Sequence, residues 1–179
     1  MRSETIARNY AEALFELAEQ QKNALERYGE LLDAVAHGIA AVPKVQAVLM
    51  SPRVTKAQKA GLLAAALRGV PKDFVLFLQA VVRRRRQGLF SEMAAEYQAL
   101  LDQKLNRVRA AVTVARPVDE KLRREIAKRL TEVIGKEVLP QFHEDPEVLG
   151  GIIVRVGDRV FDGSIRRRMT MLRRALLAR

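Results

Sequence analysis

The chain contains no cysteine, and this absence excludes disulfide bonds, thiolate nucleophiles and thiolate metal ligands together. The absence also fits a reducing compartment. No run of about 18 or more apolar residues occurs, so we expect no segment that spans a bilayer. Residues 1–5 lead directly into a charged amphipathic pattern, and we expect no secretory signal. A protein of this kind is expected to be at most peripheral to a membrane.

The groups that catalysis or nucleotide binding would need are also missing. No Gly-rich loop is followed by Lys-Ser or Lys-Thr, and no GxGxxG motif occurs. Of the two histidines, His37 is expected at a helix surface, and His143 lacks the HExxH spacing of a metal site. Ser164 has no neighbouring base and is better explained as a helix cap. We therefore expect no catalytic residue, no metal, no cofactor and no enzymatic activity.

Tryptophan is absent and aromatic residues make up only 5% of the 179 residues, while the net charge is +11. The 49% of hydrophobic residues is enough for a folded core without metal or disulfide support. The positive charge predicts an anionic partner, which could be nucleic acid, lipid headgroups or an acidic protein. A basic nucleic-acid-binding protein is one alternative, although the scarcity of aromatic residues and the lack of a recognisable motif weigh against it.

Helical spacing of apolar residues extends from the start of the chain to about Asn106. Residues 3–20 carry two adjacent apolar stripes, and further helical segments follow at Gly and Pro breaks, with Gly38 and Pro43 expected to mark the end of the second helix and the start of the third. Thr55-Lys56-Ala57-Gln58 is a capping-box pattern that opens one of these helices. The pattern predicts a bundle of six helices with short connections.

The periodicity changes after Asn106. Val108–Val114 alternates as a strand does, Asp119 is placed to cap a helix, and residues 138–142 carry a weaker strand signal. Gly157-Asp158 separates two short strands as a hairpin turn would, and Ser164 precedes a last helix whose apolar stripe is Ile165, Met169, Leu172 and Leu176. The predicted fold class is α+β, with a six-helix bundle over residues 1–106 and a smaller domain of mixed strands and two helices over residues 107–179.

Three features have alternative interpretations. The wide apolar arc of the first helix is either covered on both sides within the bundle, or one face forms a groove with the helix at Phe74–Val82 for a partner's amphipathic helix. The Arg83–Arg86 run is interpreted as a solvated helix end. Arg166–Arg168 oppose the dipole of the last helix, and they either form ion pairs inside the domain or bind an acidic partner.

Two segments resemble one protein family. The first is Tyr10-Ala11-Glu12-Ala13-Leu14-Phe15, and the second runs from Asp145-Pro146 through Gly150-Gly151 and Gly157-Asp158 to Asp162-Gly163-Ser164-Ile165-Arg166. Both are similar to segments of the delta subunits of bacterial F-type ATP synthase, relatives of the mitochondrial oligomycin-sensitivity-conferral protein. The similarity covers essentially the whole chain.

This resemblance implies a non-catalytic stator subunit. Such a subunit links the catalytic alpha/beta head to the b subunits of the peripheral stalk, so that rotation is coupled to proton transport and ATP synthesis. The resemblance also implies a peripheral location at the cytoplasmic face of the cell membrane, with no membrane insertion and no direct binding of nucleotide or nucleic acid.

The resemblance further implies which residues meet each partner. The helical domain is expected to bind N-terminal helices of the alpha subunits, and the C-terminal domain is expected to bind the b subunits. The candidates for the alpha-binding groove are Ala7, Tyr10, Ala11, Leu14, Phe77, Ala80 and Val81. The candidates for the b-binding surface are Arg166, Arg167, Met169 and Arg173. Asn9 and the Arg83–Gln87 segment depart from the residues common in the family.

Overall fold

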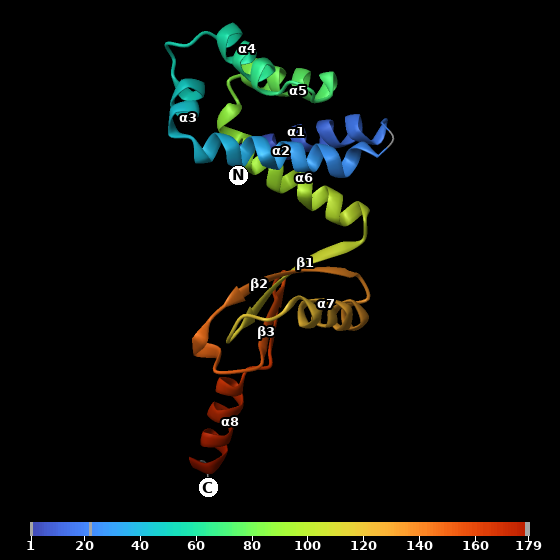
Figure 1. The fold of residues 1–179 in the computed structure, drawn as a ribbon, viewed down its shortest axis with the longest axis vertical. Coiled ribbons are helices and arrows are strands. Elements are labelled where there is room, and N and C mark those ends of the chain that lie inside the picture. The colour runs from blue at the N-terminus through green and yellow to red at the C-terminus, as the bar shows by residue number, and fades with distance from the viewer. Residues whose placement is uncertain (1, 22, 178–179) are drawn as a thin grey trace. The chain divides into compact units, whose positions relative to one another are not determined.

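The structure is a computed structural model that describes residues 2–21 and 23–177, and the chain folds as two compact units. The units are Met1–Leu101 and Asp102–Arg179, and each has its own hydrophobic core. The predicted α+β class with helices first is confirmed (Figure 1). The predicted domain boundary after Asn106 lies a few residues beyond this division.

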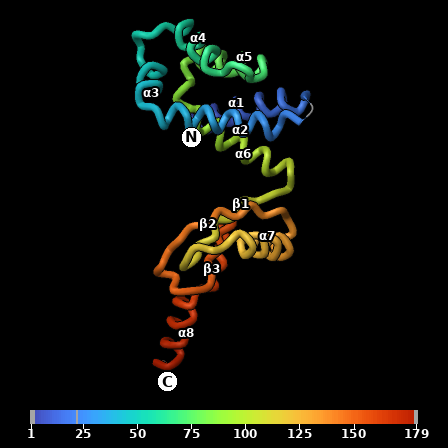
Figure 2. Tube along the Cα trace, viewed as in Figure 1, coloured from blue at the N-terminus to red at the C-terminus, as the bar shows by residue number. Residues whose placement is uncertain are grey.

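The first unit contains the six predicted helices, which the tube in Figure 2 traces in order. They are α1 (Arg2–Glu19), α2 (Ala24–Ala41), α3 (Pro43–Met50), α4 (Lys56–Ala66), α5 (Lys72–Arg83) and α6 (Phe90–Lys104), with a short 3₁₀ turn, η1 (Gln87–Leu89), before α6.

Local signals explain several helix ends, and one predicted end is wrong. The Thr55 hydroxyl accepts a hydrogen bond from the Gln58 amide, and the Gln58 side chain accepts one from the Thr55 amide, so the capping box at the start of α4 is confirmed. Pro43 occupies the first turn of α3, where its missing N–H costs nothing. Gly38 was expected to end the second helix, but α2 continues through it to Ala41.

The core of the first unit is built around α1. Its buried stripe of small residues with one leucine, Ala7, Ala11, Leu14 and Ala18, has no exposed surface. Small side chains let neighbouring helices approach α1 closely, and large residues of those helices fill the space beside them. Tyr97 of α6 donates a hydrogen bond from its hydroxyl to the Leu25 carbonyl of α2 at 2.8 Å, and burial raises the pKa of this phenol.

The arginine run lies at the exposed end of α5, in agreement with the interpretation from sequence, but only its first residue is helical. The helix ends at Arg83, and Arg84 follows as its cap. Arg85 adopts a left-handed backbone conformation with φ 58°, which reverses the chain before η1. Arginine is a good helix former, so this turn could not be predicted from the sequence in the way that a glycine would normally allow.

The second unit is a four-stranded sheet with two helices. Its elements are β1 (Arg107–Val114), α7 (Glu120–Ile134), β2 (Glu137–Glu144), a 3₁₀ turn η2 (Pro146–Val148), β3 (Ile152–Val156), β4 (Arg159–Asp162) and α8 (Ile165–Leu177).

The sheet has the strand order β2-β1-β3-β4. β1 and β2 are parallel, which requires a crossover connection, and α7 supplies it. The other two pairings are antiparallel. The predicted cap of α7 is confirmed, because the Asp119 side chain accepts a hydrogen bond from the Leu122 amide. The apolar side of α7, with Ile126 and Leu130, packs on the sheet core around Val112.

The segment before β3 is held against the start of α8. The Gly163 amide donates to the Ile152 carbonyl at 2.9 Å, and the Ile165 amide donates to the Gly150 carbonyl at 3.0 Å. Gly151 has φ 78°, and a Cβ built there would overlap with the Gly163 carbonyl oxygen. Only glycine satisfies both the backbone conformation and the close approach of the two chain segments.

Replacing Gly151 with alanine is therefore expected to destabilise the second unit by about 3 kcal/mol, the sum of left-handed strain and a backbone clash. Urea unfolding followed by circular dichroism measures this free energy. Gly135→Ala is the matched control, since Gly135 has φ 74° but open space around its Cβ position, and it should cost only about 1 kcal/mol. Equal losses for the two variants would show that the close approach has no energetic consequence.

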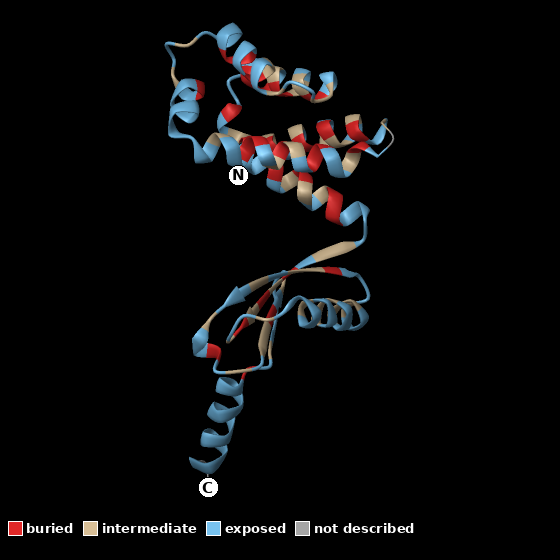
Figure 3. Cartoon of the chain, viewed as in Figure 1, coloured by how far each residue is buried: buried red, intermediate tan, exposed pale blue. Residues whose placement is uncertain are grey.

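The last helix, α8, extends away from the sheet and makes its contacts in the unit at its start, near η2 (Figure 1). None of its described residues is buried, and Figure 3 shows the helix in the exposed colour along its length. Among the described residues, no single helix is long and apolar enough to cross a bilayer; α2 and α3 together reach the length and composition, but they are bent by 98°.

Candidate protein-binding surfaces

The first candidate surface is the place where α1 and α5 meet in the first unit, at which the sequence predicts a groove. The rings of Tyr10 and Phe77 meet edge to face across it, with their centroids 6.3 Å apart and an interplanar angle of 71°. Both rings are half-buried, so each still presents part of its apolar surface outward. Ala80, one turn beyond Phe77 on α5, is exposed. These three residues of the predicted groove are on the surface.

The other four residues predicted for the groove are buried and not on the surface. Ala7, Ala11, Leu14 and Val81 have no exposed surface, because they pack in the core between α1 and its neighbours within the bundle. The sequence showed two apolar stripes on α1 but could not tell which one the bundle covers. These four residues pack in the core beneath the predicted groove, and a partner cannot contact them in this structure.

A cavity of about 680 Å³ lies beside Tyr10, between the first half of α1 and the end of α5. Its apolar and uncharged lining comes from one side of α1, at Ile6, Asn9, Tyr10 and Ala13. Ala13 is exposed, and its place at this surface could not be predicted from sequence, because a lone alanine between Glu12 and Leu14 belongs to no apolar pattern.

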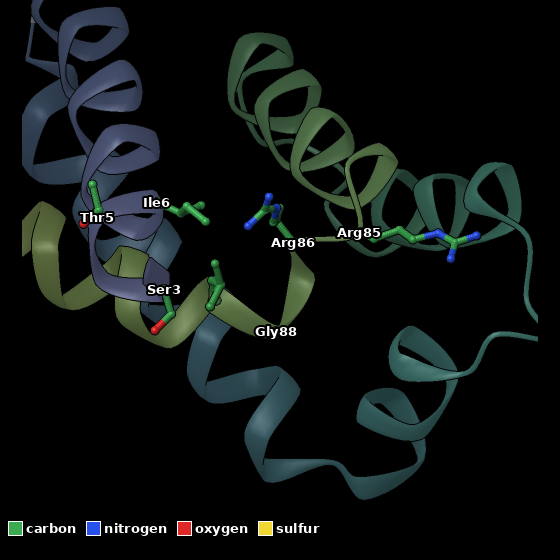
Figure 4. A pocket seen from close by; sticks show the side chains of 7 residues that line it. Ser3, Thr5, Ile6, Arg85, Arg86 and Gly88 are labelled. Carbon is green, nitrogen blue, oxygen red and sulfur yellow. The ribbon is translucent and has the colours of Figure 1, made fainter. Parts of the chain in front are cut away.

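The remaining lining of this cavity is cationic, namely Lys56, Arg83, Arg84 and Arg86. We call these four residues the basic cluster. All four are exposed. Figure 4 shows the Arg86 side chain extending toward Ile6, whereas Arg85 points away from it. Within the described residues no carboxylate forms an ion pair with any member of the cluster. Their charges are therefore not neutralised by a direct partner.

The opposite end of the groove has the opposite charge. Glu16 lies one turn beyond Ala13 on α1 and is exposed. Asp73 lies in the first turn of α5, where its side chain accepts a hydrogen bond from Gln21, just after α1, at 2.8 Å. The meeting of α1 and α5 thus has a basic end and two aromatic rings in its middle, while Glu16 and Asp73 lie toward its other end, with the exposed Lys72 next to Asp73.

The second candidate surface is the apolar stripe of α8. Ile165, Met169, Leu172 and Leu176 follow one another at spacings of four, three and four residues, which is the a/d pattern of a coiled-coil seam. Their side chains are between 45% and 74% exposed. In this unit, therefore, the stripe predicted from sequence exists as a helix face without a partner.

Arginines flank this seam. The sequence left open whether they form ion pairs inside the domain or bind an acidic partner. Arg166 forms an ion pair with Glu147 of η2 at 2.8 Å, so one cation is paired inside the unit, although both side chains are exposed. Arg167 and Arg173 are exposed, as is Met169 on the seam. An exposed pair of this kind contributes at most about 1 kcal/mol, so Arg166 can exchange partners readily.

The start of α8 is capped as expected. The Ser164 hydroxyl accepts a hydrogen bond from the Arg167 amide, and the Asp162 carboxylate accepts one from the Ser164 amide at 2.9 Å. Hydrogen bonds from Ser164, and then the charges of Arg167 and Arg166, lower the pKa of Asp162. Because the pKa of Asp162 is lowered, its ionised side chain stabilises the folded unit at pH values above the ordinary pKa of aspartate. This stabilisation is lost as the pH falls through the lowered pKa. Across the described residues there is no group of three or more His, Cys, Asp or Glu side chains that could hold a metal ion.

The comparisons with known proteins agree with one another. A family model described as the ATP synthase delta (OSCP) subunit matches residues 6–176. An ATP synthase subunit delta from Gemmatimonas aurantiaca is 45% identical over 177 residues, which cover 98% of this chain and 95% of that protein. One from Desulforamulus reducens is 39% identical over 175 residues, which cover 97% and 96%.

The fold of this chain is also similar to that of a solved structure. A chain in the mitochondrial ATP synthase hexamer of Toxoplasma gondii superposes with a TM-score of 0.67, at 22% identity, over 97% of this chain and 98% of that chain. The family match spans nearly the whole sequence, and the relatives are similar from end to end. The chain belongs to the ATP synthase delta (OSCP) family, whose members are non-catalytic stator components of F-type ATP synthase.

Proposed function

We propose that this protein ties the catalytic head of an F-type ATP synthase to its peripheral stalk through two separate surfaces. The α1/α5 groove would bind the N-terminal helix of an alpha subunit, and the α8 seam would bind the C-terminal helices of the b subunits. The observation that carries the proposal is that each unit has an exposed apolar helical surface, the groove around Tyr10 and Phe77 and the seam on α8. The family membership gives no support to the nucleic-acid-binding alternative.

The two surfaces are suited to binding and not to bond chemistry. A rotary motor needs its stationary parts tied together, since torque would otherwise turn the head with the shaft. Burial of apolar surface contributes roughly 25 cal/mol per Å², from which the cost of association is subtracted, so a useful clamp needs extended contacts. Two units on one chain let each contact be made separately while both partners stay joined. We place the protein at the cytoplasmic face of the membrane, held there by its partners and acting without catalysis of its own.

Membrane vesicles from cells that lack this chain test the proposal. We expect ATP hydrolysis by the head to persist, because no catalytic group is contributed, while ATP-driven proton pumping is lost. Adding back the purified chain should restore pumping. Pumping that is unaffected by the deletion, or hydrolysis that disappears from intact heads, would rule out a stator role.

A further inference from the structure

The charge distribution along the α1/α5 groove restricts what can bind there and in which direction. We propose that the groove accepts an amphipathic helix with one acidic end, and that this end lies over the basic cluster of Lys56, Arg83, Arg84 and Arg86. The proposal rests on the function above, since it specifies the partner of the same groove. It adds a chemical requirement on that partner and a fixed direction of docking.

The first step is that the basic cluster faces the groove. All four cations line the same cavity as Tyr10 and Ala13. The chain reversal at Arg85 produces this arrangement, because Arg84 caps α5 while Arg86 begins the return toward α6. A continuous helix would have distributed the four arginines of the run around its axis. The turn places three of the four beside α1 instead.

The second step is that these charges are unsatisfied in the isolated chain. No carboxylate among the described residues forms an ion pair with these four cations. Because the four positive charges lie close together, each one raises the electrostatic free energy of the others. The negative end of the α5 dipole offsets part of this cost. Carboxylates from a bound helix would offset more of this repulsion between the cations. They would lie at the rim of the interface, where charge determines the orientation of the partner and its rate of association.

The third step is the polarity of the groove. Glu16 and Asp73 lie at the other end, roughly the length of α5 away, about 16 Å at 1.5 Å per residue. A helix docked with its acidic end over Glu16 and Asp73 would set like charges together there and would leave the basic cluster without a counter-charge. The reverse direction pairs the acidic end with the basic cluster, so a single direction is favoured.

The test is a titration of the full chain with a fluorescent peptide from the N-terminus of the alpha subunit of the same enzyme. Arg84→Gln with Arg86→Gln should raise the Kd by roughly threefold to thirtyfold at low salt, the sum expected for two exposed ion pairs. The side chains of both residues are exposed and their helix-capping bonds use backbone atoms only, so the fold should be unaffected. The difference should shrink as salt is raised.

The matched control is Arg85→Gln with Arg68→Gln, which removes the same charge from exposed positions outside the cavity. This control should change the Kd less than twofold. Equal effects of the two double variants would overturn the proposal, because binding would then respond to net charge alone. A peptide that lacks carboxylates but binds with the same dependence on Arg84 and Arg86 would also overturn it.

Direction is measured separately with a spin label. The chain has no cysteine, so a cysteine introduced at Ala57, beside Lys56 but outside the cavity lining, or at Gln20 is its only thiol. A label at position 57 should broaden the resonances of the acidic turn of the peptide, and a label at position 20 should broaden the other end. The reverse pattern contradicts the proposed direction while leaving the groove itself intact. A peptide that fails to bind the unmodified chain contradicts the proposed function instead, and displacement of a bound peptide by a single-stranded oligonucleotide would favour nucleic-acid binding.

Discussion

Replacing Ala13 with arginine is expected to raise the Kd for the alpha N-terminal peptide by a factor of about 100, an effect typical of a disrupted interface centre. Ala13 is exposed and lines the cavity beside Tyr10. A long cationic side chain there would occupy the space of the docked helix and add a further charge to the basic cluster. Because the side chain extends outward from a helix, the bundle itself should keep its stability. Fluorescence anisotropy gives the affinity and circular dichroism gives the unfolding curve.

Two control substitutions make this result specific. Ala34→Arg adds the same side chain to an exposed position of α2 and should leave both affinity and stability unchanged. Ala11→Arg, two residues from Ala13, places the charge at a position with no exposed surface. It should destabilise the bundle by more than about 4 kcal/mol, as a charge buried in a core does. Loss of binding by Ala34→Arg to the same degree as by Ala13→Arg would remove the support for this groove.

Leu172→Asp is expected to abolish measurable binding of the C-terminal fragment of the b subunits. Leu172 is the central d position of the α8 seam and is 64% exposed. An aspartate there would be buried without a partner in a coiled coil, which costs several kcal/mol. Since α8 has no buried residue, the second unit should unfold at the same urea concentration as before. Size-exclusion chromatography of the mixture detects the complex.

The control for this change lies on the same helix. Leu177 is 76% exposed and falls outside the a/d positions that Leu172 and Leu176 occupy. Leu177→Asp introduces the same chemistry off the seam and should weaken binding by less than about threefold, as for an interface rim position. Similar losses for both variants would show that α8 binds without a defined seam.

Local features of the fold could be predicted from the sequence because their causes are local. The side chains of Thr55, Asp119 and Ser164 cap their helices through bonds to residues three positions away, so the pattern contains the whole interaction. The change from helical to alternating periodicity likewise marked β1. Gly157 has φ 55° at the first loop position between β3 and β4, as a type II′ hairpin requires.

The candidate surfaces could be predicted only in part, because exposure is decided by distant residues. The sequence does not show which of the two stripes of α1 is buried, because only the packing of the other helices buries Ala11 and leaves Tyr10 partly exposed. The stripe of α8 was visible in sequence, but whether the sheet covers it was not. The basic cluster depended on a left-handed Arg85, whose conformation has no sequence signal of the kind that glycine gives.

The most direct test of the two-surface account is the mass of a complex formed from this chain, the alpha N-terminal peptide and the C-terminal fragment of the b subunits. Native mass spectrometry should find all three components in one species, and the Kd for the peptide should be the same with and without the b fragment. A mixture that contains only pairwise complexes, with one partner displacing the other, would contradict the proposal that separate surfaces on this chain join the head to the stalk.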